Sequence, residues 1–255
     1  FCHEFSHTMG LPDFYPYNDV AQIDDQTMEL WDLMDGGEYT DNGYTPTPYT
    51  PWEKDVMGWK PLITIQETPR KITLHKDDAL KVPTTYQKEY LILHNIQKEG
   101  WASKLLGQGM LVYRVNYEPE TVNMDDHVND TPGKPGMTIV PADGKLISSY
   151  SVHSKEEQKK YYASHAGDPF PGTSHVDHIG SIVLNHSKVD KPLFHITENT
   201  DGTITFEYLI DTGIDDITTE QQGTDNRIYT LDGRFVGTDR TVLPPGIYIQ
   251  NRKKF

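Results

Sequence analysis

The chain of 255 residues has one cysteine, Cys2, so it cannot form an internal disulfide bond. We expect Cys2 to pack as a small apolar residue behind the first helix. No apolar run approaches the roughly 20 residues needed to cross a bilayer, so we expect no membrane span. Basic residues are also few: 23 Lys and Arg against 38 Asp and Glu give a formal charge of −15. Without a basic stripe to neutralise phosphates, we exclude nucleic acid as a partner.

The first residues carry the pattern H-E-x-x-H, formed by His3, Glu4 and His7. Residues four apart lie on one face of an α-helix, so the two imidazoles point to one place, where they can bind zinc. Glu4 lies close enough to take a proton from a metal-bound water as a general base. Gly10 allows a sharp turn after the helix, and Asp13, six residues beyond His7, can then return as a third ligand. The alternative is a helix with two surface histidines.

A methionine turn follows this motif. The residues from Trp31 to Gly37 are W-D-L-M-D-G-G, in which Met34 precedes two glycines. A Gly three residues and an acid six residues after the second His, with a methionine turn downstream, belong to the metzincin pattern of zinc peptidases. A Met in an apolar run is otherwise ordinary core. Because three elements agree in order and spacing, we favour a zinc peptidase site with Met34 beneath the metal.

Longer stretches resemble a known family. These are HEFSHTMGLPDFY, WDLMDGG, WEKDVMGWKP, EYLILHNIQKEGWASKLLGQGMLVYRVNY and DPFPGTSH. They resemble the immune inhibitor A-like family of secreted bacterial metallopeptidases, within the metzincin clan, over roughly residues 1–210. The resemblance implies a zinc endopeptidase with His3 and His7 as ligands, Glu4 as general base and, by metzincin spacing, Asp13 as third ligand. It also implies protein or peptide substrates and a secreted or cell-surface location in bacteria.

Two further expectations concern the site. Phe1 already lies inside the predicted helix, so we expect the sequence to be the C-terminal part of a longer secreted precursor that lacks its N-terminal subdomain here. Such a fragment need not be active alone. Tyr39 follows the methionine turn, and some metzincins use a Tyr near this place to assist the oxyanion. We therefore consider Tyr39 a candidate substrate-binding residue, with a structural loop residue as the alternative.

The hydrophobic pattern predicts an α+β fold. Residues 1–68 are the C-terminal part of the catalytic domain, rich in loops, with a short helix at 51–59. Over residues 69–210 short apolar runs with period two predict an antiparallel β-sandwich, with a hairpin turn at Asp201-Gly202. The runs are KITL, ALKV, EYLILHNI, GMLVYRVNY, MTIVPAD, GSIVLN, LFHITEN and TITFEYL.

The last residues form a separate predicted unit. Residues 211–226 are polar and acidic and predict a linker. Residues 227–255 predict three short strands with a hairpin turn at Asp232-Gly233. This part resembles the short C-terminal sorting modules of surface-destined bacterial proteins, which act as an address and not as a catalyst. The alternative is an edge hairpin that completes the sandwich.

Carboxylates are dense near the start of the chain: Asp19, Asp24, Asp25, Asp35 and Asp41. Calcium takes six to eight oxygen ligands from such loops, so we also consider a structural calcium ion, although no D-x-[DN]-x-[DN]-G loop is present.

A second functional hypothesis stays open. The β-rich part could be a surface-displayed, adhesin-like binding module with a degenerate peptidase half. Two charged segments, residues 116–134 and 154–162, are predicted as solvated loop or short surface helix and not as binding sites.

Overall fold

The computed structural model describes residues 1–24, 27–117, 122–210, 228–230, 235–239, 243, 248–250 and 253–254. The chain divides into two compact units, Phe1–Ile210 and Asp211–Phe255. The predicted linker at 211–226 and the predicted turn at Asp232-Gly233 lie outside the described residues.

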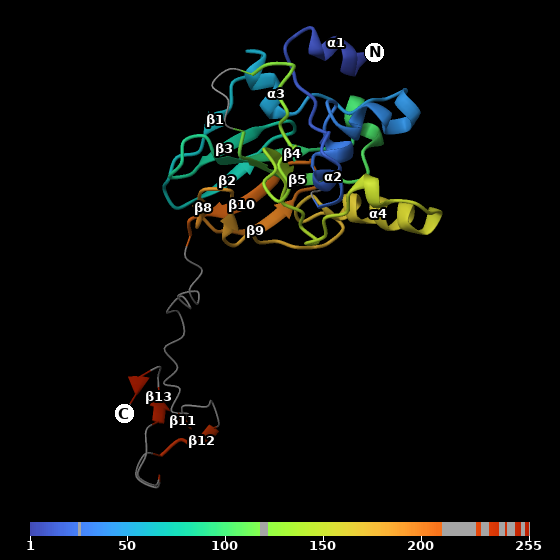
Figure 1. Ribbon diagram of the computed structural model, residues 1–255. Coiled ribbons are helices and arrows are strands. Elements are labelled where there is room, and N and C mark those ends of the chain that lie inside the picture. Colours follow the sequence, from blue (N-terminus) through green and yellow to red (C-terminus); the bar gives the residue numbers. More distant parts are fainter. Residues whose placement is uncertain are drawn as a thin grey trace. The chain divides into compact units, whose positions relative to one another are not determined.

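The first unit begins with short helices joined by loops (Figure 1). They are α1 (Cys2–His7), α2 (Asp19–Asp24), η1 (Glu29–Trp31), η2 (Gly36–Gly43) and α3 (Pro51–Val56). Helix α3 starts where expected, because Thr50 and Glu53 form a capping box and Pro51 occupies the first turn. Its Trp52 is buried, and Val56 in the last turn is 39% exposed.

A five-stranded sheet follows, with strand order β1-β3-β4-β5-β6. Its strands are β1 (Ile63–Thr64), β3 (Ala79–Pro83), β4 (Tyr90–Ile96), β5 (Gly109–Val115) and β6 (Met137–Ile139). All neighbours pair antiparallel except β1 and β3, which pair parallel, so this sheet is mixed and not purely antiparallel as predicted. β1 was not predicted, because a pair of residues is too short to show a period.

A second sheet has the order β2-β10-β9, built from β2 (Arg70–Leu74), β9 (Leu193–Glu198) and β10 (Ile204–Tyr208). The predicted hairpin at Asp201-Gly202 joins β9 to β10, and Gly202 has the positive φ of 78° that this turn requires. A two-stranded ribbon pairs β7 (Ile182–Val183) with β8 (Lys188–Val189).

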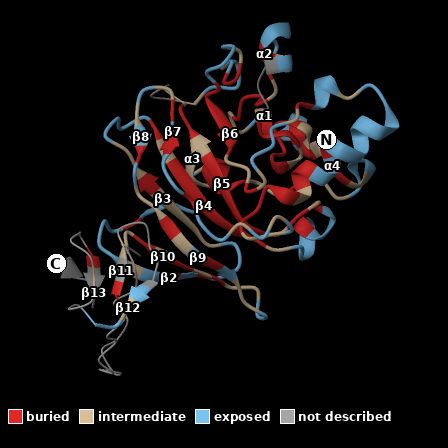
Figure 2. Ribbon diagram, turned by 90° about the horizontal axis from the view of Figure 1, so that it is seen from below, coloured by how far each residue is buried: buried red, intermediate tan, exposed pale blue. Residues whose placement is uncertain are grey.

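The central strands β4 and β5 of the five-stranded sheet are buried on both faces, as Figure 2 shows. One face packs against the second sheet, through residues such as Leu91 and Leu93 of β4 and Phe206 of β10. On the other face Ile92 packs with Trp31 and other residues of the first helices and loops. Because successive side chains of a strand point to opposite faces, β4 joins both cores. Residues 1–210 therefore form one unit, and the predicted division between residues 68 and 69 stays a prediction.

The remaining elements of this unit are η3 (Gly100–Lys104), η4 (Ser149–Ser151) and α4 (Lys155–Gly167). The charged segment predicted as loop or short surface helix is thus the first part of a 13-residue helix. The hydroxyl of Tyr161 in α4 donates to Glu29 Oε2 at 2.9 Å, which attaches this helix to η1.

The second unit contains β11 (Ile228–Thr230), β12 (Phe235–Gly237), β13 (Tyr248–Gln250) and β14 (Lys253–Lys254), in the sheet order β12-β11-β13-β14. The structure is α+β, as predicted. Among the described residues, no helix has the length and apolar character that a membrane crossing requires.

Two buried carboxyl groups join the methionine turn to α3. Thr50 donates to Glu53 Oε2 through its backbone N–H at 2.6 Å and its hydroxyl at 2.9 Å, while Asp32 Oδ1 accepts the N–H of Met34 at 2.7 Å. Asp32 Oδ2 and Glu53 Oε1 are buried without another donor, and a proton held between the two carboxyl groups would satisfy both. Burial raises the pKa of Glu53 from 4.5 to about 7, and burial, together with the charge of Glu53, raises the pKa of Asp32 well above its usual value of 3.8.

We predict that this pair makes the fold less stable as the pH rises. The folded state holds a proton that the unfolded chain releases near pH 4.5, so the free energy of unfolding falls as the pH rises from about 4.5 to about 7. In Glu53→Gln the amide oxygen can accept from Thr50 while its N–H donates to Asp32. Between pH 5 and pH 8, the free energy of unfolding of the parent chain should fall by about 1–3 kcal/mol more than that of Glu53→Gln. Urea unfolding at both pH values measures this, and parallel curves for the two proteins would contradict it.

Candidate metal centre

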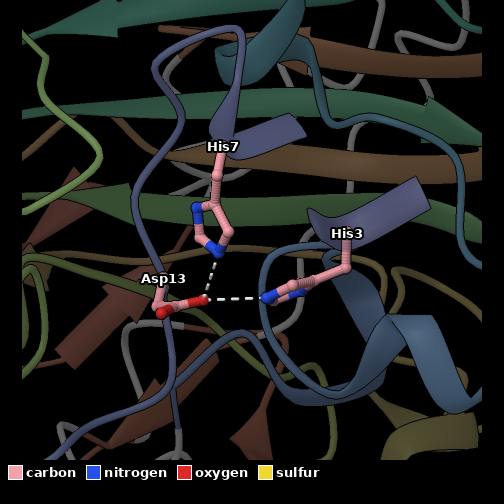
Figure 3. A group of neighbouring side chains, drawn as sticks. All are labelled: His3, His7 and Asp13. Carbon is pink, nitrogen blue, oxygen red and sulfur yellow. Dashed lines mark ion pairs between the residues drawn. The ribbon is translucent and has the colours of Figure 1, made fainter. Parts of the chain in front are cut away.

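Helix α1 and the turn after it bring His3, His7 and Asp13 together (Figure 3). His3 Nε2 lies 2.9 Å and His7 Nε2 lies 3.3 Å from Asp13 Oδ1. The two rings are nearly perpendicular, with their centroids 4.9 Å apart. His3 and Asp13 are buried and His7 is half-buried. Among the described residues, these three form the group of His, Cys, Asp and Glu side chains that could hold a metal ion, with ligand atoms within 4.8 Å of one another.

Backbone carbonyls fix the orientation of both rings. His3 Nδ1 lies 2.9 Å from the oxygen of Leu33, and His7 Nδ1 lies 2.8 Å from the oxygen of Leu11. A carbonyl oxygen only accepts hydrogen bonds, so each Nδ1 must carry a proton. In the neutral rings both Nε2 atoms therefore present lone pairs to Asp13, as metal-binding imidazoles do.

The turn after α1 returns the chain to the site. Gly10 has φ of +90°, and a side chain would meet no atom within 4 Å there, so the positive φ alone accounts for the glycine. The N–H of Leu11 then bonds to the oxygen of Ser6 at 3.3 Å. On the far side of Asp13, the N–H of Phe14 bonds to the oxygen of Met34 at 2.8 Å. Asp13 is thus held between the helix and the methionine turn.

Two tyrosines support Asp13 in a way that the sequence analysis missed. The hydroxyl of Tyr17 donates to Asp13 Oδ2, and the ring of Tyr15 stacks near that of His3 at 6.2 Å between centroids. Burial acts to raise the pKa of Asp13, but hydrogen bonds from His3, Tyr17 and Tyr15 outweigh it and hold that pKa below the ordinary value. The repeated Tyr in FYPY, directly after Asp13, was the available signal.

The charges at this site fit a bound cation. Asp13 Oδ1 is buried and faces the Nε2 atoms of both imidazoles, so while both rings are neutral no hydrogen-bond donor reaches it. Burial acts to lower the pKa of His3, but Asp13, the carbonyl of Leu33 and the charge of Glu38 together raise it to about 9. A proton on His3 or a metal ion can therefore relieve the repulsion between the three lone pairs. Two imidazoles and one carboxylate are a ligand set that zinc accepts in catalytic sites.

The methionine turn lies against this group. Met34 is fully buried in the same core as Leu11 and Phe14. Leu33, the residue before it, supplies the carbonyl that orients His3. The role of Met34 beneath a metal ion stays a prediction.

Glu4 and Tyr39 lie outside the group of three. Glu4 is on α1 between the two histidines and is exposed to solvent. Tyr39 is 71% exposed, and a hydrogen bond with Glu38 and the charges of Glu38 and Glu4 raise its pKa. These two side chains are therefore near one another at the surface, and their roles stay predictions.

Two expectations for this region need revision. Cys2 is exposed and not packed behind the helix, because it is the first residue of α1, at the end of the chain. Calcium gains no support from the described residues: the carboxylate of Asp35 is already used by the hydroxyl of Thr27 and by the N–H groups of Met28, Glu29 and Gly36. The side chain of Asp24 and all of Asp25 lie outside the described residues.

A comparison with protein families matches residues 1–60 to the immune inhibitor A peptidase M6 catalytic domain. The resemblance inferred from the sequence is confirmed for this segment, which has the sequence of a metallopeptidase. Searches of curated proteins and of solved structures found no match.

We predict that zinc binding at this site releases a proton. Because the pKa of His3 is about 9 before metal binds, a proton must leave Nε2 at pH 7, and the zinc affinity should rise about tenfold for each pH unit from 7 to 9. Competition with a coloured chelator at pH 7, 8 and 9 measures the affinity. Calorimetry in two buffers of different ionisation enthalpy counts the protons. An affinity that does not change over this range would contradict the prediction.

Proposed function

We propose that residues 1–60, which match the immune inhibitor A peptidase M6 catalytic domain, bind zinc through His3, His7 and Asp13 as part of a metalloendopeptidase. The reaction is hydrolysis of internal peptide bonds in extracellular proteins. One observation carries the proposal: three ligand atoms lie within 4.8 Å of one another, and both imidazoles are oriented by backbone carbonyls. A surface pair of histidines would not need a buried aspartate or this orientation.

Bound zinc supplies a Lewis acid, which polarises a peptide carbonyl and acidifies water. The remaining chemistry belongs to side chains of the protein. Glu4 follows His3 on the same helix and is exposed, so its carboxylate can take a proton from water and deliver it to the leaving amine. Tyr39, also exposed, is a candidate to contact substrate and assist the oxyanion.

Other contacts support the finer architecture that we propose. Residues 1–68 form the C-terminal part of a metzincin-like catalytic domain, and residues 69–210 form a β-sandwich, since the two sheets pack face to face through one core. Among the described strands, β11 to β14 pair with one another alone, which supports a separate module of the sorting type at 227–255. A secreted or cell-surface location follows from the family resemblance. The adhesin-like alternative has no comparable support in the described residues.

We predict that Glu4→Gln keeps the metal and loses turnover. Glutamine preserves the shape of the side chain but cannot accept the proton, so cleavage of an unfolded protein substrate should fall at least about a hundredfold. Zinc content should stay at one ion per chain. The matched control is Glu156→Gln on α4, an exposed glutamate paired with Lys160, which should leave cleavage unchanged.

The metal has its own test. His7→Ala should lose both the zinc and the activity, and a chelator should stop cleavage by the parent chain. Undiminished cleavage by Glu4→Gln, or cleavage that resists the chelator, would refute the proposed mechanism.

A further inference from the structure

A loop far along the chain holds the residue directly after Asp13. Asn129 is buried, and its amide Nδ2 donates to the oxygen of Phe14 at 2.6 Å. Its Oδ1 accepts the N–H of Met137 in β6 at 2.9 Å. The side chain of Asn129 thus connects the backbone next to the third ligand to the edge of the five-stranded sheet. Both ends of this amide are used, so it has one orientation.

Asp130, the next residue of the loop, binds the backbone of Tyr17, whose hydroxyl supports the Asp13 side chain. Asp130 Oδ1 accepts the N–H of Tyr17 at 2.5 Å and the N–H of Asn18 at 3.2 Å. Its Oδ2 lies 2.6 Å from Nδ1 of His127, whose ring packs against that of Tyr17 at 4.9 Å between centroids. Asp130 therefore fixes the backbone of Tyr17, which supports Asp13, and His127 packs beside the Tyr17 ring.

These contacts form a continuous path to the proposed metal. The hydroxyl of Tyr17 donates to Asp13 Oδ2, so Oδ1 stays directed at the two imidazoles. A carboxylate held at one oxygen cannot rotate freely about its last bond, and partners of this kind typically change metal affinity about 10–100-fold. If the Asp13 carboxylate rotated freely, Oδ1 would face the two imidazoles for only part of the time, and the third ligand would be lost for the rest.

We propose that Asp130 is a positioning residue for the zinc ligand Asp13, acting through Tyr17, with Asn129 fixing the adjacent backbone. The inference rests on the proposed function, because it assigns a role toward the same metal site. Asn129 and Asp130 then support the peptidase site, although they lie in the segment that the sequence predicts as solvated loop. The contacts join residues more than a hundred positions apart, which local patterns cannot show.

The experiment measures zinc affinity of the purified full chain by chelator competition, with the visible absorption of bound cobalt as a second readout. Asp130→Ala should weaken zinc binding about tenfold and change the cobalt spectrum. Asp130→Asn should restore most of the affinity, because its amide oxygen can still accept from Tyr17 and Asn18. The matched control is Asp126→Ala in the same loop, whose carboxylate accepts from Tyr117 and Asn123 and not from residues 13–18.

A double variant separates positioning from general loss of structure. If Asp130 acts through Tyr17, then Asp130→Ala should add little to the loss caused by Tyr17→Phe, because both variants interrupt one path. Fully additive losses, or an equal loss in Asp126→Ala, would overturn the inference. Thermal unfolding of each metal-free variant shows that the chains compared are folded.

Failure of the inference differs from failure of the proposed function. A parent chain that binds no zinc and cleaves nothing would overturn both. A parent chain that binds one zinc ion, with unchanged affinity in Asp130→Ala, would overturn the role of Asp130 alone.

Discussion

The carbonyl oxygens of Leu33 and Leu11 each accept the Nδ1 proton of a histidine, and the chemistry of the site depends on this constraint. With those protons fixed, both Nε2 atoms must turn toward Asp13, and three lone-pair atoms meet in a largely buried space. Such a meeting is unfavourable unless a positive charge joins it. The pKa of His3 is accordingly raised to about 9, so in the absence of a metal a proton supplies the positive charge that a zinc ion would bring.

The position of these carbonyls depends in turn on the five-stranded sheet. Leu33 and Leu11 belong to the core that packs on one face of β4 and β5, together with Tyr113 and Ile92. The opposite face of the same strands packs on the second sheet. The histidines lie on a helix of six residues, too short to be stable alone. The geometry of the histidines therefore depends on packing against the β-rich residues. The predicted catalytic and β parts belong to one compact unit, Phe1–Ile210.

The sequence was most informative where the chemistry is local. Spacing within one helix and one turn predicted the meeting of His3, His7 and Asp13, and alternation predicted most strands of both sheets. It was least informative for partners that come from elsewhere in the chain. Neither the carbonyl of Leu33 nor the side chain of Asp130 carries a local signal, because the fold alone brings each one to the site. The exposure of Cys2 was not predicted for the same reason, because the residue type does not show which part of the chain covers a helix.

Buried carboxylates near the site hold its loops together through hydrogen bonds. Asp35 accepts four hydrogen bonds that close the loop before the methionine turn, and the pair of Asp32 and Glu53 closes the turn against α3. Burying carboxyl groups is unfavourable unless protons or hydrogen bonds compensate. Burial accordingly raises the pKa of Asp35 to about 6. Hydrogen bonds to these carboxylates, and the protons that they hold, close the loop beside His3, His7 and Asp13, so the stability of this loop is sensitive to pH.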